Sequence, residues 1–358
     1  MTGCAHHSVF PTLSGEPPAV IAHRGASGYL PEHTLAAYEL AIEQGADFIE
    51  PDLVSTKDGT LIARHELNIT ETTDVGAHPE FASRRTAKTI DGKRAEGWFA
   101  DDFTLAEIKT LRARQRLPFR EQQFNGRFEI PTFQEVIELA KRASDRTGRV
   151  IGVYPETKHP TYHRSVGLPL EEKLIELLDH YGLNGSTAPV VIQSFETTNL
   201  KGLRKLTEIR LVQLIDGDGI APDGGPVPGK PYDFTVSGDP RTYADLLTLD
   251  GLKAIKTYAD GIGPWKRYLV GFADSAGRDR SADDSGEKLG EPTAVIRDAH
   301  SVGLFVHAWT FRNEPRYLAS DYGGDPLNEY RQFFGLGVDA VFSDFPDTAV
   351  SARAACRK

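Results

Sequence analysis

Residues 48–66 read FIEPDLVSTKDGTLIARHE, two runs of strand-forming residues on either side of an Asp58-Gly59 turn. Asp-Gly between two such runs is the strongest short-range signal for a β-hairpin. If these are the two turn residues, His65 lies directly opposite Asp52. Glu50 lies two residues before Asp52, and side chains two apart on a strand share a face. The spacing therefore predicts that Glu50, Asp52 and His65 converge on one small area.

The apolar neighbours of these carboxylates point to a buried site. A lone Glu-X-Asp on a strand most often faces solvent. Here the strand is surrounded by apolar residues, namely Phe48, Ile49, Leu53, Val54, Leu61 and Ile62. Like charges buried a few ångströms apart are tolerated mainly when a cation or a proton lies between them. The pattern thus favours a cation site.

Composition limits the classes of function. The chain has 358 residues, a length that allows one large domain or two smaller ones, and its formal charge is −10. The acidic balance, without a basic block, argues against a nucleic-acid partner. The sequence contains no run of about 18 apolar residues, so we expect no transmembrane segment.

Short apolar segments recur along the chain and alternate with helical patterns. The expected strands are 19–25, 48–54, 151–158, 189–195, 209–215, 260–264, 304–311 and 338–344. The expected helices are 35–44, 133–144, 170–181, 197–207, 243–258, 292–302 and 328–336. This alternation predicts a TIM (β/α)8 barrel, with an extra β-hairpin arm after the second strand. A doubly wound sheet is the alternative, but residues 23–28 match its glycine-rich phosphate turn poorly.

Active sites of TIM barrels lie at the carboxyl ends of the strands, where several strands of this chain carry polar residues. Glu156 and Lys158 share a face of the third strand, so a third carboxylate joins Glu50 and Asp52. Three carboxylates suit Mg²⁺ or Ca²⁺ better than Zn²⁺. Arg24 beside Lys158 suits a phosphate group.

Two histidines at adjacent strand ends complete the set. His23 and His65 could lie on either side of a ligand, one removing a proton and the other donating one. Together with the metal and phosphate ligands, they predict phosphate-ester cleavage.

The motifs around these residues resemble the glycerophosphodiester phosphodiesterase family, most closely its periplasmic bacterial type. The resemblance rests on residues 22–34 (AHRGASGYLPEHT), Glu50-Pro51-Asp52 and 154–158 (YPETK), with further echoes at 193–195, 261–264, 306–310 and 343–346. It spans nearly the whole chain from Val20 to Pro346.

The resemblance implies a TIM barrel that hydrolyses glycerophosphodiesters, such as glycerophosphocholine or glycerophosphoethanolamine, to sn-glycerol 3-phosphate and an alcohol. It implies the following roles: His23 and His65 as the acid/base pair; Glu50, Asp52 and Glu156 as ligands of a divalent cation, with Ca²⁺ favoured over Mg²⁺; Arg24 and Lys158 on the phosphate; and Trp309 on the glycerol side.

Two positions depart from the usual family pattern. His33 stands where many members have Asn, and we expect it to be structural. Glu66 follows the second histidine where Asp is usual, which moves the charge by one methylene and could alter the orientation of His65.

Outside the barrel, residues 69–127 are expected to form a cap-like insertion and 216–241 and 273–290 to be surface loops. We assign residues 1–18 to a disordered leader, 19–350 to a single catalytic domain and 351–358 to a tail. Thr2-Gly3-Cys4 resembles a processed lipoprotein site, which favours a periplasmic, secreted or lipid-anchored protein, while a cytoplasmic location stays open. A Cys4–Cys356 disulfide is a minor option.

Two other functions stay open: phospholipase D-like or lysophospholipid cleavage on the same barrel, and non-catalytic binding of metal and phosphate. The second has no need for two histidines. The oligomeric state is not indicated by the sequence.

Overall fold

The computed structural model describes residues 10–273, 277–279 and 283–356. Within them, all eight expected strands pair in parallel around a closed barrel, and two of the strands are interrupted at a proline, Pro51 or Pro155. The barrel strands are β1 (Ala19–His23), β2 and β3 (Phe48–Glu50 and Asp52–Ser55), β7 and β8 (Gly152–Val153 and Glu156–Thr157), β9 (Val191–Ser194), β10 (Arg210–Ile215), β13 (Gly261–Pro264), β17 (Phe305–Phe311) and β18 (Ala340–Ser343). β18 pairs with β1 and thereby closes the ring, so the expected TIM barrel is confirmed.

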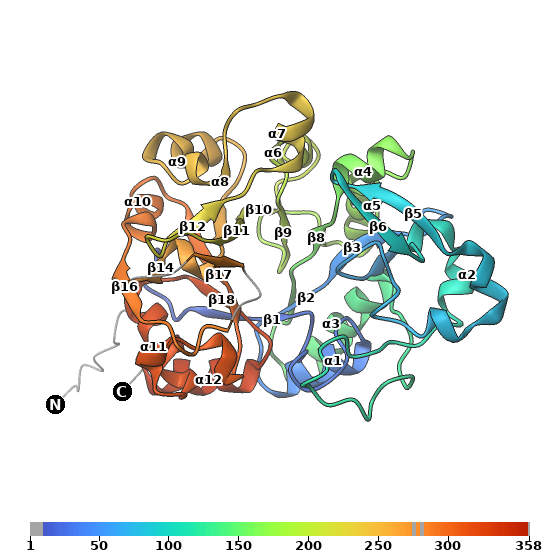
Figure 1. Cartoon of the computed structure of the whole chain (residues 1–358), viewed down its shortest axis with the longest axis horizontal. Helices are drawn as coiled ribbons and strands as arrows, with labels where there is room; N and C mark the ends of the chain where they lie inside the picture. Colours follow the sequence, from blue (N-terminus) through green and yellow to red (C-terminus); the bar gives the residue numbers. More distant parts are fainter. Residues whose placement is uncertain (1–9, 274–276, 280–282, 357–358) are drawn as a thin grey trace.

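Helices cover the outside of the barrel (Figure 1). They are α1 (Leu35–Glu43), α3 (Phe133–Thr147), α4 (Pro160–Ser165), α5 (Glu171–His180), α6 (Thr197–Leu203), α7 (Tyr232–Ser237), α8 (Tyr243–Leu246), α9 (Leu249–Lys256), α10 (Val295–Ser301), α11 (Pro326–Leu336) and α12 (Pro346–Ala355). α3 shows why they form where they do: Thr132 and Glu135 make a capping box at its start, and Gly148 ends it in a left-handed conformation. No helix within the described ranges combines the length and apolar character needed to cross a membrane.

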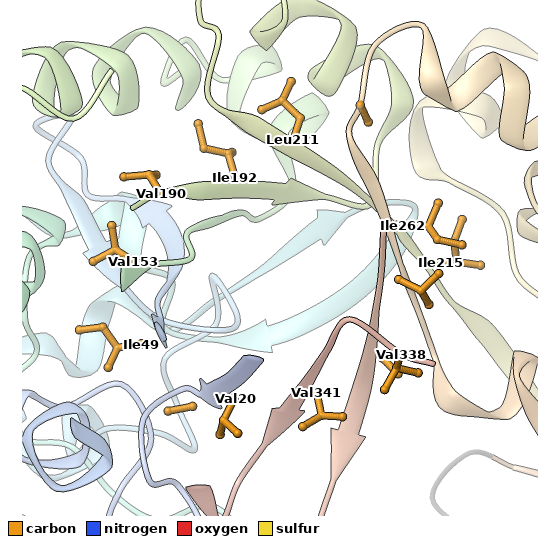
Figure 2. Close-up of a cluster of buried hydrophobic side chains, with 14 of the residues drawn as sticks. Val20, Ile49, Val153, Val190, Ile192, Leu211, Ile215, Ile262, Val338 and Val341 are labelled. Carbon is orange, nitrogen blue, oxygen red and sulfur yellow. The ribbon is translucent and has the colours of Figure 1, made fainter. Parts of the chain in front are cut away.

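The core has two layers because alternate residues of a strand point to opposite faces. Val20 and Ala22 belong to the cluster between strands and helices, which Figure 2 shows strand by strand around the barrel. Ile21, between them, belongs to a separate cluster with Val212 and Phe342. This inner cluster fills the barrel, so only the polar residues at the strand ends are free to form a site.

The hairpin after β3 forms, but its register differs from the expected one. β3 pairs with β4 (Leu61–Ala63) so that Leu53 faces Ala63, and Arg64 donates its N–H to the Asp52 carbonyl. The turn has three residues, and its last, Gly59, has φ +78°. The expectation that His65 lies opposite Asp52 was therefore wrong by one residue, because a three-residue loop with a left-handed glycine shifts the pairing.

The insertion is a packed unit whose core is shared with β3 and β4. It contains β5 (Thr86–Ile90), β6 (Lys93–Gly97) and α2 (Leu105–Ile108), at the right of Figure 1. Its core is made of the buried residues Val54, Ile62, Leu67, Ile69, Val75, Phe81, Ile90, Phe99, Ala100, Phe103, Ile108, Leu111, Ala113 and Ile130. Phe99 and Phe103 are thus structural residues, and the residues of the insertion that line the cavity at the barrel mouth lie at the hairpin tip, between 90 and 95.

Segment 216–241, expected as a loop, is partly ordered into strands and a helix. β11 (Gly217–Ile220) pairs with β12 (Pro226–Pro228) and with β15 (Arg278–Asp279), and α7 follows. β14 (Val270–Phe272) pairs with β16 (Leu289–Pro292). Glycine-rich composition concealed these short strands because it is also typical of loops.

Parts of the expected leader and of the expected tail are ordered where they are described. Phe10 and Thr12 are buried, so the leader is packed from residue 10 onward. α12 continues to Ala355, so most of the expected tail is helical. Cys4 lies outside the described residues, and the lipid anchor and the Cys4–Cys356 disulfide stay predictions.

Candidate active site

A cavity of about 800 Å³ opens at the carboxyl ends of the barrel strands. Its lining contains most of the residues predicted from the sequence, namely His23, Arg24, Glu50, His65, Glu156, Lys158 and Trp309. Asp52 lies beneath them and is fully buried. The fold therefore brings the predicted set together from four of the eight barrel strands and the hairpin arm.

Glu50, Asp52 and Glu156 form a compact acidic triad. Each offers a carboxylate oxygen, and these oxygens all lie within 4.8 Å of one another. The pairing of β3 with β8 sets Asp52 beside Glu156, and β2 ends at Glu50. Burial and the neighbouring Asp52 raise the pKa of Glu50 well above its usual value, and raise that of Glu156 to about 8 although Lys158 opposes the change. In the absence of a cation, the triad thus tends to hold protons.

Asp52 differs from its two neighbours. Burial alone would raise its pKa, but His33 and Arg24 outweigh burial and hold the pKa well below the usual value. Its Oδ2 lies 2.9 Å from His33 Nε2, whereas Oδ1 is buried and has no hydrogen-bond partner among the described residues. A charged carboxylate that has a buried oxygen without a partner and lies close to two other carboxylates is suited to a divalent cation, and the oxygen-only set is compatible with one.

Surrounding groups hold the triad in place. Gln193 donates to Glu50 Oε1 at 3.0 Å, and the backbone N–H of Arg24 donates to Glu50 Oε2 at 2.8 Å. His33 is fully buried, with Nδ1 2.8 Å from the Tyr38 hydroxyl. Because Asp52 is ionised and accepts only, His33 donates from Nε2 and accepts at Nδ1. His33 is therefore a positioning residue for Asp52, in agreement with its expected structural role.

Two cationic side chains, Arg24 and Lys158, line the cavity and contact carboxylates of the triad. Arg24 has φ +62°, a left-handed conformation uncommon for this residue type. Its Nη1 lies 3.3 Å from Glu32 and its Nε 3.4 Å from Asp52 Oδ2. Lys158 Nζ lies 3.0 Å from Glu156 Oε1 and 5.6 Å from the centre of the Phe195 ring. Burial opposes both charges, but these carboxylates outweigh it and raise both pKa values.

His23 is held by a carboxylate that the sequence analysis did not assign. Its Nδ1 lies 2.6 Å from Asp344 Oδ1, at the end of β18. Burial would raise the pKa of Asp344, but Arg120 and Arg312 outweigh it and lower the pKa well below its usual value. An ionised Asp344 accepts only, so His23 donates from Nδ1 and leaves Nε2 as the acceptor. Burial and Arg24 lower the pKa of His23 to about 4, so the ring is neutral at pH 7.

His65 has a similar arrangement with a more exposed partner. Its Nδ1 lies 2.9 Å from Glu66 Oε1, and its Nε2 lies 3.4 Å from Lys158 Nζ. Burial, Arg24 and Lys158 lower the pKa of His65 to about 3. Glu66 thus contacts Nδ1 of His65 in the same way as Asp344 contacts Nδ1 of His23, although the Glu66 side chain is longer by one methylene.

Trp309 forms the aromatic wall of the cavity. Its indole Nε1 donates to the Gly263 carbonyl at 2.7 Å, and its ring meets Phe195 edge to face at 5.9 Å. These two contacts fix the indole plane, so it presents a rigid apolar surface to a ligand.

Four residues that were not predicted from the sequence hold predicted site residues, or the partners of those residues, in place: Asp344, Glu32, Gln193 and Arg120. Asp344 ends the last strand, where a barrel carries functional groups, so its position was the available signal. Glu32 and Gln193 lie within quoted motifs, but no role was assigned to them. Arg120 had no signal, because it comes from the insertion, 224 residues from Asp344 in the sequence.

Comparison with known proteins gives consistent matches. The model of the glycerophosphoryl diester phosphodiesterase family matches residues 23–348. A glycerophosphodiester phosphodiesterase of Arabidopsis thaliana is 39% identical over 356 residues, covering 95% of this chain and 87% of that protein. One of Haemophilus influenzae is 30% identical over 376 residues, covering 98% of this chain and 94% of that protein.

Solved structures share the fold. A glycerophosphoryl diester phosphodiesterase of Silicibacter pomeroyi superposes with a TM-score of 0.63 at 18% identity, covering 97% of this chain and 98% of that one. A phosphodiesterase of Oleispira antarctica, solved with the product sn-glycerol-3-phosphate, has a TM-score of 0.60 at 21% identity and covers 95% and 98% of the two chains. At these identities the likeness shows the fold.

Proposed function

The chain belongs to the glycerophosphoryl diester phosphodiesterase family, and on that premise we propose that it hydrolyses glycerophosphocholine and glycerophosphoethanolamine to sn-glycerol 3-phosphate and the free alcohol. The observation that supports this most is the meeting of an acidic triad, two cations and two carboxylate-held histidines in one cavity. Of the functions considered, a non-catalytic binder explains the histidine pair least.

The two cations would bind the phosphate. Arg24 offers a planar fork and Lys158 a point charge, and both are suited to phosphate oxygens. A phosphodiester here would replace part of the pairing that Glu32 and Glu156 now provide. Trp309 would contact the glycerol carbons from the side.

His23 and His65 would move the protons. His23 presents an unprotonated Nε2, so it can take the proton of the attacking hydroxyl while the new bond to phosphorus forms. The bond from phosphorus to the alcohol then breaks, and His65 gives that alcohol a proton. Both rings are neutral in the free protein, so His65 must gain its proton when the anionic substrate binds, because a nearby negative charge raises the pKa of a histidine.

The glycerol 2-hydroxyl would be the nucleophile. It is adjacent to the phosphate in the substrate, and intramolecular attack can lower a barrier by roughly 7 to 11 kcal/mol. Water would open the resulting cyclic phosphate with the histidine roles reversed. A 2-deoxy substrate analogue tests this step: the cyclic route predicts almost no turnover, whereas unchanged turnover would show direct attack by water.

Glu50, Asp52 and Glu156 would hold a divalent cation, with Ca²⁺ favoured and Mg²⁺ as the alternative. The cation would neutralise charge on the phosphate oxygens. Carboxylate ligands alone suit either ion, and Ca²⁺ is favoured because its coordination geometry is the more flexible of the two.

The deciding experiment measures glycerol 3-phosphate release from glycerophosphocholine, before and after chelation, with Ca²⁺ and Mg²⁺ added back separately. His23→Ala should lower kcat by about 100- to 10,000-fold, the range expected for general acid-base catalysis. His180→Ala, at an exposed histidine of α5, is the matched control and should change nothing. Absence of release by the unaltered protein with either ion would refute the proposal.

A further inference from the structure

The last part of the insertion returns from this shared core to the barrel and brings two arginines to the active site. Arg116 and Arg120 lie on the segment between α2 and α3, after the core residues Leu111 and Ala113. Both side chains reach carboxylates that contact predicted site residues. The insertion is therefore connected to the centre on its deep side, as well as at the hairpin tip.

Arg120 makes the more buried of the two connections. Its side chain is 4% exposed, and each of its three nitrogens donates a hydrogen bond. Nη2 donates to Asp344 Oδ2 at 2.6 Å, Nε to Glu314 Oε1 at 2.6 Å, and Nη1 to the Ser27 carbonyl at 3.1 Å. The guanidinium thus ties the end of β18 to the loop after β1.

The two oxygens of the Asp344 carboxylate have different partners: one contacts arginines and the other contacts His23. Oδ2 accepts from Arg120 and from Arg312 Nε at 2.9 Å, while Oδ1 faces His23 Nδ1 at 2.6 Å. Two cations on one oxygen keep the group ionised and fix its plane. The other oxygen then holds the imidazole of His23 in one tautomer and one orientation.

Arg116 makes a similar indirect contact with Arg24, the residue that follows His23. Its Nε donates to Glu32 Oε2 at 3.1 Å, and Glu32 pairs with Arg24 Nη1 at 3.3 Å. The Arg116 side chain is 31% exposed, so water screens this contact more than that of Arg120. Of the two arginines, Arg120 therefore makes the stronger contact between the insertion and the active site.

We propose that the insertion is a positioning arm of the catalytic centre and that Arg120 acts through Asp344 to orient His23. This rests on the proposed function only for the role of His23 in proton transfer. Arg120 touches no reacting atom, so it is a positioning residue. Without the Arg120 guanidinium, Asp344 Oδ2 keeps its contact with Arg312, whose side chain is 23% exposed, so the plane of the carboxylate that faces His23 is held less firmly.

A double-mutant cycle tests the activity side. Arg120→Gln should lower kcat by about 10- to 100-fold, the usual range for a partner of an active-site group, with KM little changed. Asp344→Asn should cost at least as much, and the double variant no more than Asp344→Asn alone, because both act on His23 by one route. Arg120→Lys keeps the charge without the fork and should recover part of the loss. Losses that multiply in the double variant would overturn the proposal.

Arg114→Gln is the matched control. Arg114 lies on the same segment, has an exposed side chain and donates its backbone N–H to the Thr72 carbonyl. The activity of the Arg114→Gln variant should equal that of the unaltered protein. Thermal unfolding of each variant separates a positioning effect from a loss of folded protein.

A second measurement is independent of activity. In protein labelled with ¹⁵N-histidine, the His23 Nδ1–H proton should give a downfield resonance because it donates to a carboxylate, and His23→Ala assigns it. Arg120→Gln should shift or broaden this resonance, and Arg114→Gln should leave it. An unchanged resonance in Arg120→Gln would overturn the proposal. An inactive protein whose resonance still depends on Arg120 would refute the proposed function alone.

Discussion

At the scale of the residue, Glu50 and Asp52 show how neighbours decide the charge of a buried carboxyl group. They are two residues apart and equally buried, yet the pKa of Glu50 is raised and that of Asp52 is lowered. Burial favours the neutral form in both. Only Asp52 receives a hydrogen bond from His33 together with the charge of Arg24 nearby, and these contacts outweigh burial. The charge of Asp52 therefore disfavours ionisation of Glu50.

Glu50→Gln should have opposite effects on stability with and without a cation. Without added cation it removes a repelled carboxylate, so the midpoint of thermal unfolding should rise. Addition of Ca²⁺ should raise the midpoint of the unaltered protein, because a ligand that binds only the folded state stabilises it by about 2.7 kcal/mol at 100 times its Kd. The variant should lose that increase. Equal responses of both proteins to Ca²⁺ would place the cation elsewhere.

At the scale of the element, the tip of the β5–β6 hairpin contacts the barrel through a partly buried pair of residues that both have left-handed backbone conformations. Asp91, at the hairpin tip, and His159, after β8, have φ of +47° and +48°. Asp91 Oδ2 and His159 Nδ1 lie 2.6 Å apart, and His159 Nε2 lies 3.4 Å from Glu66. Burial lowers the pKa of His159, but these two carboxylates outweigh it and raise the pKa to about 9. A charged His159 thus connects the hairpin with the partner of His65.

Asp91→Asn should loosen the hairpin tip without unfolding the barrel. In hydrogen exchange at pH 7, amides of residues 90–95 should exchange faster in the variant, and those of β1 and β18 should not change. Because the folded pKa of His159 is raised, its stabilising contribution is complete below about pH 6.5 and is lost as pH rises through about 9. The difference between the two proteins should therefore shrink at high pH. Asp250→Asn, at an exposed position on α9, is the control.

At the scale of the whole molecule, burial of neutral histidines makes stability depend on pH. His163 on α4 is fully buried, and neither of its ring nitrogens has a hydrogen-bond partner among the described residues. Burial and the nearby His159 lower its pKa to about 3. The unfolded chain binds a proton at this residue below about pH 6.5, whereas the folded protein does so only near pH 3. The free energy of unfolding therefore falls as pH decreases through this window.

His163→Phe should reduce that pH dependence. Between about pH 6.5 and pH 4, the slope of unfolding free energy against pH should decrease by up to about 1.4 kcal/mol per pH unit, the effect of one proton. At about pH 5 the variant should be the more stable protein, because the aromatic ring keeps much of the packing. Urea unfolding at several pH values measures this. His180→Phe, at an exposed site, should leave the slope unchanged.

Much of the site could be predicted because barrel geometry places strand ends together. His23, Glu50 and Glu156 were identified from their positions at the ends of apolar segments, and the structure lines one cavity with them. The register of the hairpin was missed because it depended on whether the turn used two residues or three. With Gly59 in a left-handed conformation the turn has three residues, and the length of the turn depends on packing as well as on the local sequence.

Local patterns in the chain were enough to predict the alternation of strands and helices, the barrel and the chemical types gathered at its mouth, because periodicity and residue spacing are local properties. The groups that hold the reactive side chains could be identified only in the folded protein. Asp344 meets His23 across 321 residues, and Arg120 meets Asp344 across 224. Such contacts depend on how the insertion packs against the closed barrel, and no local pattern in the chain encodes a distance between segments that far apart.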